Sequence, residues 1–298
     1  MLYERLVSEG CDVLGIGKDT ARSSSGGDYP GVDISQRHDV AVAVNGWNAD
    51  AIFYLAAVHR SSQEAADTAD DVWFGQSIAV NVQGVVNFLE TLPTGCSLFY
   101  AASSHVFGRP KCHSQDETTP FRPNSVYGIT KTAGIHACRY YRHSRGARVS
   151  VGILYNHESP LRRPEFVSKR IVQSAVAISR GQLDKLTLGD LDARVDWGYA
   201  PDYVDAMVRI SALPDGDDFI VATGETHSVQ EFVEIAFEFV NLDWSGHVQV
   251  DNRILRRESW SLSGNSERLR LRTGWAPTIS FREMIRRLVD AERMRASD

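Results

Sequence analysis

Short apolar runs alternate with longer amphipathic segments through the first half of the chain. The runs predict buried strands at 11–16, 51–54, 97–101 and 149–155, and the amphipathic segments predict helices at 78–92 and 127–143. This alternation is typical of an α/β fold with a doubly wound parallel sheet. After residue 156 the pattern becomes mixed, with helices expected at 166–179, 229–241 and 280–294. We therefore expect a sheet domain followed by a smaller mixed α/β lobe.

The composition excludes several classes of protein. The chain has 298 residues, of which 43% are hydrophobic and 23% charged, which is enough for a large core in one domain or two joined lobes. A formal net charge of −6 argues against nucleic-acid binding. No apolar run reaches the roughly 18 residues of a membrane helix, and no signal peptide is predicted. Four cysteines without paired spacing favour a reducing cytoplasm, and no histidine spacing predicts a metal site.

Tyr127 and Lys131 carry the strongest chemical signal, because they lie one turn apart on one face of the predicted helix 127–143. A cation close to a phenol favours the phenolate, so we expect Lys131 to lower the pKa of Tyr127 and make it a base. Ser103 or Ser104, together with His105, follows the predicted strand 97–101. Ligands of open parallel sheets bind beyond the carboxyl ends of the strands, and we expect these side chains to meet there.

Several further motifs make the chain similar to a known family. They are Leu55-Ala56-Ala57, Asn81-Val82-Gln83-Gly84, Asn156-His157-Glu158-Ser159-Pro160 and Asp196-Trp197-Gly198. With them, nearly the whole chain resembles the extended short-chain dehydrogenase/reductases, and within these the GDP-mannose 4,6-dehydratases. The resemblance implies a Rossmann-like NAD(P)-binding domain at 1–155, to which the chain returns at about 195–212, and a substrate-binding lobe at 156–298.

The resemblance also implies roles for the catalytic candidates. Ser103 becomes the catalytic hydroxyl, Tyr127 the base for hydride transfer at sugar C4, and Lys131 its electrostatic partner. In the family a glutamate then takes the C5 proton and helps water to leave from C6, but His105 occupies that position here. An imidazole is a sufficient base for a proton beside a ketone. His105 therefore replaces the glutamate, marks an epimerase or 4-keto reductase, or simply hydrogen-bonds to the backbone.

Cofactor-binding residues are implied in two regions. Leu55, Ala56 and Ala57 follow the strand 51–54 and resemble the family's cofactor loop. After the strand 11–16, Lys18 and Arg22 resemble the basic pair of NADP-binding relatives, so we expect NADP, with NAD as the alternative. Asp33 is where the family has an aspartate that contacts adenine.

The resemblance places a nucleotide-sugar substrate mainly on the second lobe. The candidate substrate-binding residues are Asn156, Glu158, Lys169, Arg170, Arg194 and Arg256. Arginine and lysine suit diphosphate binding by charge and geometry. Arg194 is shifted by one residue from the family's arginine, and such a shift reverses the side-chain direction in a strand.

The sequence begins at a segment that resembles the helix after the family's first strand and glycine-rich turn. We therefore expect the first strand to be missing and dinucleotide binding to be weakened. A non-catalytic relative, which binds a sugar nucleotide or pairs with an active homologue, is the alternative to an enzyme. By analogy with the family we expect a homo-oligomer, either a dimer or a tetramer.

Overall fold

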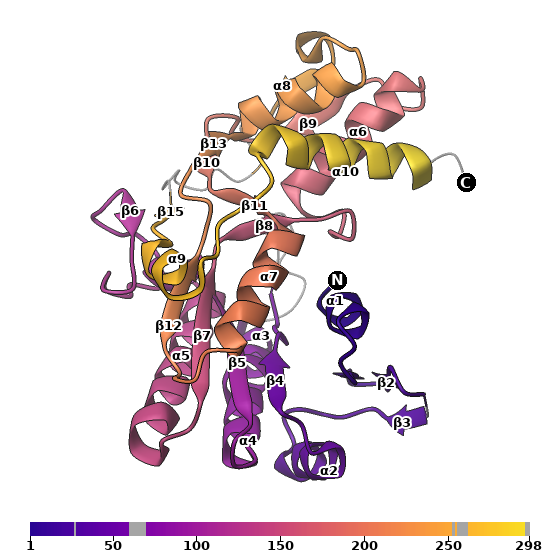
Figure 1. Ribbon diagram of the computed structural model, residues 1–298. Coiled ribbons are helices and arrows are strands. Elements are labelled where there is room, and N and C mark those ends of the chain that lie inside the picture. Colours follow the sequence, from indigo (N-terminus) through magenta and orange to yellow (C-terminus); the bar gives the residue numbers. More distant parts are fainter. Residues whose placement is uncertain (27, 60–69, 252–253, 255–261, 296–298) are drawn as a thin grey trace.

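A computed structural model describes residues 1–26, 28–59, 70–251, 254 and 262–295 (Figure 1). Its centre is a sheet of four parallel strands in the order β12-β7-β5-β4. These strands are β4 (Ala51–Tyr54), β5 (Ser97–Ser103), β7 (Val149–Leu154) and β12 (Asp218–Val221). The prediction of a doubly wound parallel sheet is confirmed, and the strands predicted at 51–54, 97–101 and 149–155 all lie in it.

Helices cover both faces of this sheet. One face carries α2 (Arg37–Trp47), α4 (Val85–Glu90) and α5 (Val126–Arg145), and the other carries α7 (Ala200–Ser211) and α9 (Glu267–Thr273). Strand β5 serves both layers, because Leu98, Tyr100 and Ala102 point into the first core while Phe99 and Ala101 point into the second. Burial on both faces explains why this strand reads as a continuous apolar run.

The segment predicted as one helix at 78–92 is divided into three parts. Helix α3 (Asp70–Ile78) passes into the π-helical turn η1 (Ala79–Gly84) and then into α4. Asn81, on the π-helical turn, is fully buried. Its side-chain oxygen accepts from Val58 N at 3.0 Å, and its amide donates to Thr130 Oγ1 at 2.9 Å. The turn therefore ties the loop after β4 to helix α5.

A second lobe lies above the sheet in Figure 1. Its helices α6 (Val167–Ser179), α8 (Val229–Phe239) and α10 (Phe281–Arg295) share one apolar core. Three two-stranded sheets lie in this part of the chain: β8 (Asn156–Glu158) with β11 (Trp197–Tyr199), β9 (Leu186–Leu188) with β14 (Val248–Val250), and β10 (Arg194–Val195) with β13 (His227–Ser228). A fourth pairs β6 (Ser114–Gln115), from the first half of the chain, with β15 (Ser263–Gly264). Short 3₁₀ turns are η2 (Ser104–Phe107) and η3 (Trp244–Gly246). The helices predicted at 166–179, 229–241 and 280–294 are confirmed to within two residues.

The N-terminal region differs from the prediction. Helix α1 (Leu2–Ser8) is present, and Gly10 follows it with φ +82°. The predicted strand at 11–16, however, is shortened to β1 (Leu14–Ile16), and it pairs antiparallel with β2 (Thr20–Ser23), which pairs with β3 (Asp28–Pro30). The expectation that this segment joins the parallel sheet is therefore wrong. A connection of only three residues closes an antiparallel hairpin, whereas parallel neighbours need a long crossover.

No described helix is both long enough and apolar enough to cross a membrane.

Candidate active site

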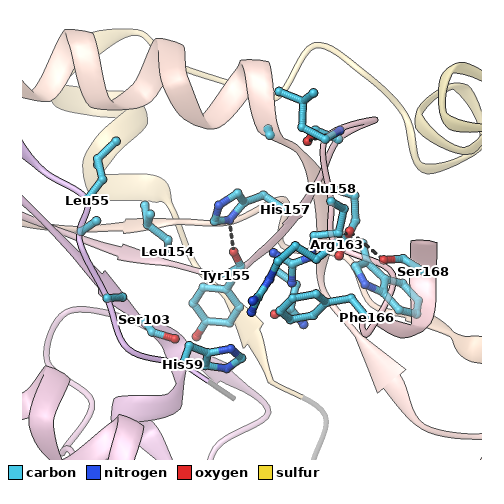
Figure 2. A pocket seen from close by; sticks show the side chains of 18 of the residues that line it. Leu55, His59, Ser103, Leu154, Tyr155, His157, Glu158, Arg163, Phe166 and Ser168 are labelled. Carbon is cyan, nitrogen blue, oxygen red and sulfur yellow. Dashed lines mark hydrogen bonds and ion pairs between the residues drawn. The ribbon is translucent and has the colours of Figure 1, made fainter. Parts of the chain in front are cut away.

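One cavity of about 590 Å³ opens at the carboxyl ends of β4, β5 and β7. Figure 2 shows Ser103 and His59 on one side of it and Glu158, Arg163 and Phe166 on the other. Eight of the residues predicted for the site line it: Leu55, Ala57, Ser103, His105, Tyr127, Lys131, Asn156 and Glu158. The cavity lies where parallel sheets bind ligands, and its size is ordinary for a small-molecule site.

Local structure fixes the catalytic candidates on β5 and α5. Ser103 ends β5, and its hydroxyl accepts a hydrogen bond from His105 N at 3.3 Å, which starts the turn η2. Ser125 caps α5 by accepting from Gly128 N at 3.1 Å. Gly128 is required at this contact, because a Cβ there would lie 2.6 Å from His105 O. The close approach of α5 and η2 brings Tyr127 beside His105.

Protonation of Tyr127 and Lys131 differs from the expectation. Burial raises the pKa of Tyr127 to about 12, against smaller lowering effects of the Ser103 hydroxyl and Arg162. Burial also lowers the pKa of Lys131 to about 7, and its ammonium group donates to Ala101 O at 2.7 Å. The expected lowering of the Tyr127 pKa by Lys131 is therefore wrong for the unliganded protein, because desolvation of the phenolate outweighs the nearby charge.

Two histidines surround the Tyr127 ring. The centroid of the His59 ring lies 4.5 Å from that of Tyr127, and the His105 ring lies 5.6 Å from it. The two imidazoles are 6.0 Å apart. The sequence reasoning missed His59; the available signal was its place just after Leu55-Ala56-Ala57, at the end of a parallel strand. The Tyr127 phenol and the imidazoles of His59 and His105 therefore lie close together on one side of the site.

The second lobe contributes polar groups from β8 and the loop that follows it. Buried Glu158 accepts from Ser168 Oγ at 2.7 Å and lies 3.4 Å from Arg162 Nε, and burial raises its pKa. Burial lowers the pKa of His157 to about 4. Its neutral ring donates from Nδ1 to Tyr155 O at 2.8 Å. Asn156 begins the strand and lines the cavity.

Two arginines of this loop were not foreseen from the sequence. Arg162 and Arg163 line the cavity, and their guanidinium carbons lie 3.5 and 5.9 Å from the centroid of the Phe166 ring. Their only sequence signal was their position shortly after Asn156-His157-Glu158-Ser159-Pro160. Arg162 supplies positive charge near Tyr127, since it acts to lower the pKa of that phenol.

The remaining predicted ligands lie away from this cavity. Lys169 pairs with Glu292, Arg170 donates to Thr187 O at 2.6 Å, and Arg194 pairs with Glu231 at 3.1 Å. Each of these cations therefore meets an acceptor of the protein itself, and none of the three lines the cavity. Arg256 lies outside the described residues.

The cofactor candidates divide in the same way. Leu55 and Ala57 line the cavity, and Ala56 packs against the core beneath it. Lys18, Arg22 and Asp33 belong to the N-terminal hairpin and the segment after it. Arg22 lies over the Tyr3 ring at 5.0 Å. Asp33 accepts from Ser35 N and Ser35 Oγ, which lowers its pKa.

Comparison with solved structures shows the same fold. The structure matches a putative epimerase from Burkholderia cenocepacia with a TM-score of 0.83 at 24% identity, covering 98% of this chain and 93% of that one. It matches RMD from Pseudomonas aeruginosa, complexed with NADPH, with a TM-score of 0.79 at 20% identity, covering 89% and 88%.

Sequence comparison is more specific. GDP-mannose 4,6 dehydratase 1 of Arabidopsis thaliana is 38% identical over 195 residues, which are 65% of this chain and 54% of that protein. The human GDP-mannose 4,6 dehydratase is 37% identical over 233 residues, which are 70% and 62% of the two chains. The chain thus spans little more than half the length of the curated relatives it matches. The family model for GDP-mannose 4,6 dehydratase matches residues 2–288, and the chain belongs to this family.

Proposed function

We propose that the protein is a nucleotide-sugar 4,6-dehydratase that acts on a GDP-linked hexose such as GDP-mannose. The observation that carries this proposal is the meeting of Ser103, His105, Tyr127 and Lys131 in one cavity. Relatives named GDP-mannose 4,6 dehydratase support the choice of substrate. We also propose that the chain divides near residue 156 into a cofactor-binding domain and a substrate-binding lobe. The sugar would then be held between the sheet and the β8 region.

A nicotinamide cofactor fits the cavity. Leu55 and Ala57 offer an apolar wall beside Tyr127 and Lys131, and Arg162 offers positive charge for a phosphate. When bound, such a cofactor supplies a hydride acceptor and donor next to the sugar. Neighbouring structures include complexes with NADPH and with NAD. We favour NADP because of the basic pair Lys18 and Arg22, and parallel titrations with NADPH and NADH test that choice.

The chain's own side chains divide the reaction between them. Tyr127, hydrogen-bonded to Ser103, removes the O4 proton as C4 is oxidised, and Lys131 holds the strand end through Ala101 O. The C5 proton becomes acidic once C4 is a ketone, and His105 is the base that removes it. Asn156 and Glu158 orient the sugar, and Arg162 and Arg163 bind phosphate.

We further propose that the protein is a homo-oligomer and works in the cytoplasm. Light scattering on the purified chain measures the size of the oligomer.

Product analysis by mass spectrometry and NMR tests the function. With GDP-mannose and NADP, we expect a 4-keto-6-deoxy sugar that has lost one water. His105→Asn should abolish that product and retain substrate binding, and Tyr127→Phe should lower turnover about 10²–10⁴-fold. His143→Gln, an exposed change on the same helix, is the matched control and should leave turnover unchanged.

The alternatives give different products. A sugar of unchanged mass and altered configuration identifies an epimerase, and consumption of NADPH with a keto sugar identifies a reductase. Nucleotide-sugar binding without conversion by the wild type supports a non-catalytic relative and contradicts the proposal.

A further inference from the structure

One oxygen of the Glu158 carboxylate holds two partners at once. Oε2 accepts a hydrogen bond from Ser168 Oγ at 2.7 Å and lies 3.4 Å from Nε of Arg162. Ser168 belongs to helix α6, and Figure 2 shows its side chain pointing to Glu158. Both residues are buried. A serine of the second lobe therefore reaches an arginine of the cavity through one buried carboxylate.

Arg162 is fixed on the cavity wall by more than this ion pair. Its guanidinium carbon lies 3.5 Å from the centroid of the Phe166 ring, and its backbone N–H donates to Ser159 O at 3.0 Å. Within the described part of the chain, nothing accepts a hydrogen bond from its terminal nitrogens Nη1 and Nη2. A guanidinium held at Nε and along one face presents these two nitrogens as a fork that matches phosphate oxygens.

The hydroxyl of Ser168 keeps Glu158 suited to this task. Burial raises the pKa of Glu158, and the positive charge of Arg162 and the hydrogen bond from Ser168 act against that rise. A buried carboxylate that loses a hydrogen bond takes up a proton more easily and holds its direction less firmly. Ser168 therefore maintains both the charge and the orientation of the group that pairs with Arg162. The second oxygen, Oε1, has no partner among the described residues and stays available for the sugar.

Resting on the proposed function, we propose that Ser168 is a positioning residue that fixes Arg162 through Glu158, so that Arg162 binds a phosphate group of a nucleotide ligand. Fixing an arginine in advance raises affinity, because a side chain with many rotamers otherwise loses that freedom when the ligand binds. The nucleotide sugar and the dinucleotide cofactor both carry a diphosphate, and separate titrations identify which of them Arg162 holds.

Calorimetric titration of the full chain with GDP and with NADPH tests the positioning role. Ser168→Ala should weaken the binding of one of these ligands about 10-fold or more, which is the loss expected for one hydrogen bond to a charged group. Ser168→Thr keeps a hydroxyl and should recover most of the affinity. Ser174→Ala is the matched control, because Ser174 is buried on the same helix and its side chain bonds to no described residue.

A second substitution shows whether the effect of Ser168 passes through Arg162. In an Arg162→Met background, Ser168→Ala should weaken binding of that ligand no further, because the group that Ser168 positions is gone. Equal losses in the two backgrounds overturn the proposal. A lower Tm of Ser168→Ala with unchanged affinity for both ligands also overturns it, because that is the result of a purely structural hydrogen bond.

The same titrations separate this proposal from the proposed function. A loss with GDP assigns the substrate's diphosphate to Arg162, and a loss with NADPH assigns the cofactor's. If the wild type does not convert GDP-mannose while the Ser168 effect still depends on Arg162, the proposed function fails and the positioning role stands. Conversion of GDP-mannose by the wild type, with both affinities unchanged in Ser168→Ala, overturns the positioning role alone. A wild type that binds neither GDP nor NADPH overturns both.

Discussion

Removal of one partner from the buried ion pair between Lys169 and Glu292 should destabilise the protein strongly. The pair joins α6 to α10, and the side chains of Lys169 and Glu292 are only 6% and 13% exposed. Lys169 also donates to Pro160 O at 3.3 Å, on the loop that follows β8. Either Lys169→Met or Glu292→Leu leaves the other charge in a site with little water.

The expected magnitude follows from this burial. Breaking a buried pair by removing one partner costs about 3–5 kcal/mol. An unfolding entropy of about 2.1 cal/mol/K per residue amounts to about 0.6 kcal/mol/K for 298 residues, so either single substitution should lower Tm by about 5–8 °C. The double variant should lose much less than the sum of the two, because two apolar side chains of similar volume replace both charges.

Thermal and urea unfolding followed by circular dichroism measure this cycle. Arg282→Met is the matched control: Arg282 pairs with Glu238 in the same lobe, but both side chains are more than half exposed, and such pairs contribute about 0–1 kcal/mol. Single variants within about 1 kcal/mol of wild type would refute the reasoning. The cycle also tests the predicted substrate role of Lys169, because a stable double variant with weakened nucleotide-sugar binding would make Lys169 a ligand rather than a structural residue.

Three further predictions concern buried polar groups. Folding lowers the pKa of Lys131 from 10.5 to about 7. Between these two pH values the unfolded chain binds one more proton than the folded protein, so the free energy of unfolding should rise with pH. Urea titrations at several pH values should show this rise in the wild type and a smaller one in Lys131→Met. Asn81→Ala removes the bonds to Val58 N and Thr130 Oγ1, and we expect a lower kcat, lower Tm and faster hydrogen exchange at Val58; unchanged exchange would contradict the anchoring role. Buried Asp196 accepts hydrogen bonds from Thr223 N and Oγ1, Gly224 N and Gly264 N, so Asp196→Asn should cost about 2–4 kcal/mol in urea unfolding because its amide nitrogen cannot accept.

Local patterns made most of the helices and strands predictable from the sequence. Apolar runs of strand length gave β4, β5 and β7, and the 3.6-residue period gave α5, α6, α8 and α10, because both signals depend only on neighbours along the chain. The spacing of Tyr127 and Lys131 is of the same kind, since one helical turn sets it. The positions of Ser103 and His105 followed from the end of a strand.

Pairing between distant segments was not predictable in this way. The fourth strand of the sheet, β12, comes from the part of the chain assigned to the second lobe, and β1 pairs in a hairpin instead of the sheet. A short strand has the same apolar pattern whichever neighbour it finds, so register and partner are decided by the packing of the whole chain. The same holds for His59 and Arg162, which reach the cavity on loops.

Charge and protonation were likewise decided by the tertiary structure. The sequence placed a lysine near a phenol and predicted a lowered pKa for Tyr127. The folded protein buries both groups, and this burial raises the pKa of Tyr127 and lowers the pKa of Lys131. The sequence also marked Lys169 as a phosphate ligand, whereas the fold brings Glu292 to it from 123 residues away. The sequence by itself determines residue types and their local spacing. Desolvation of a charged group and its long-range partners depend on the folded structure, because distant segments must pack around the group first.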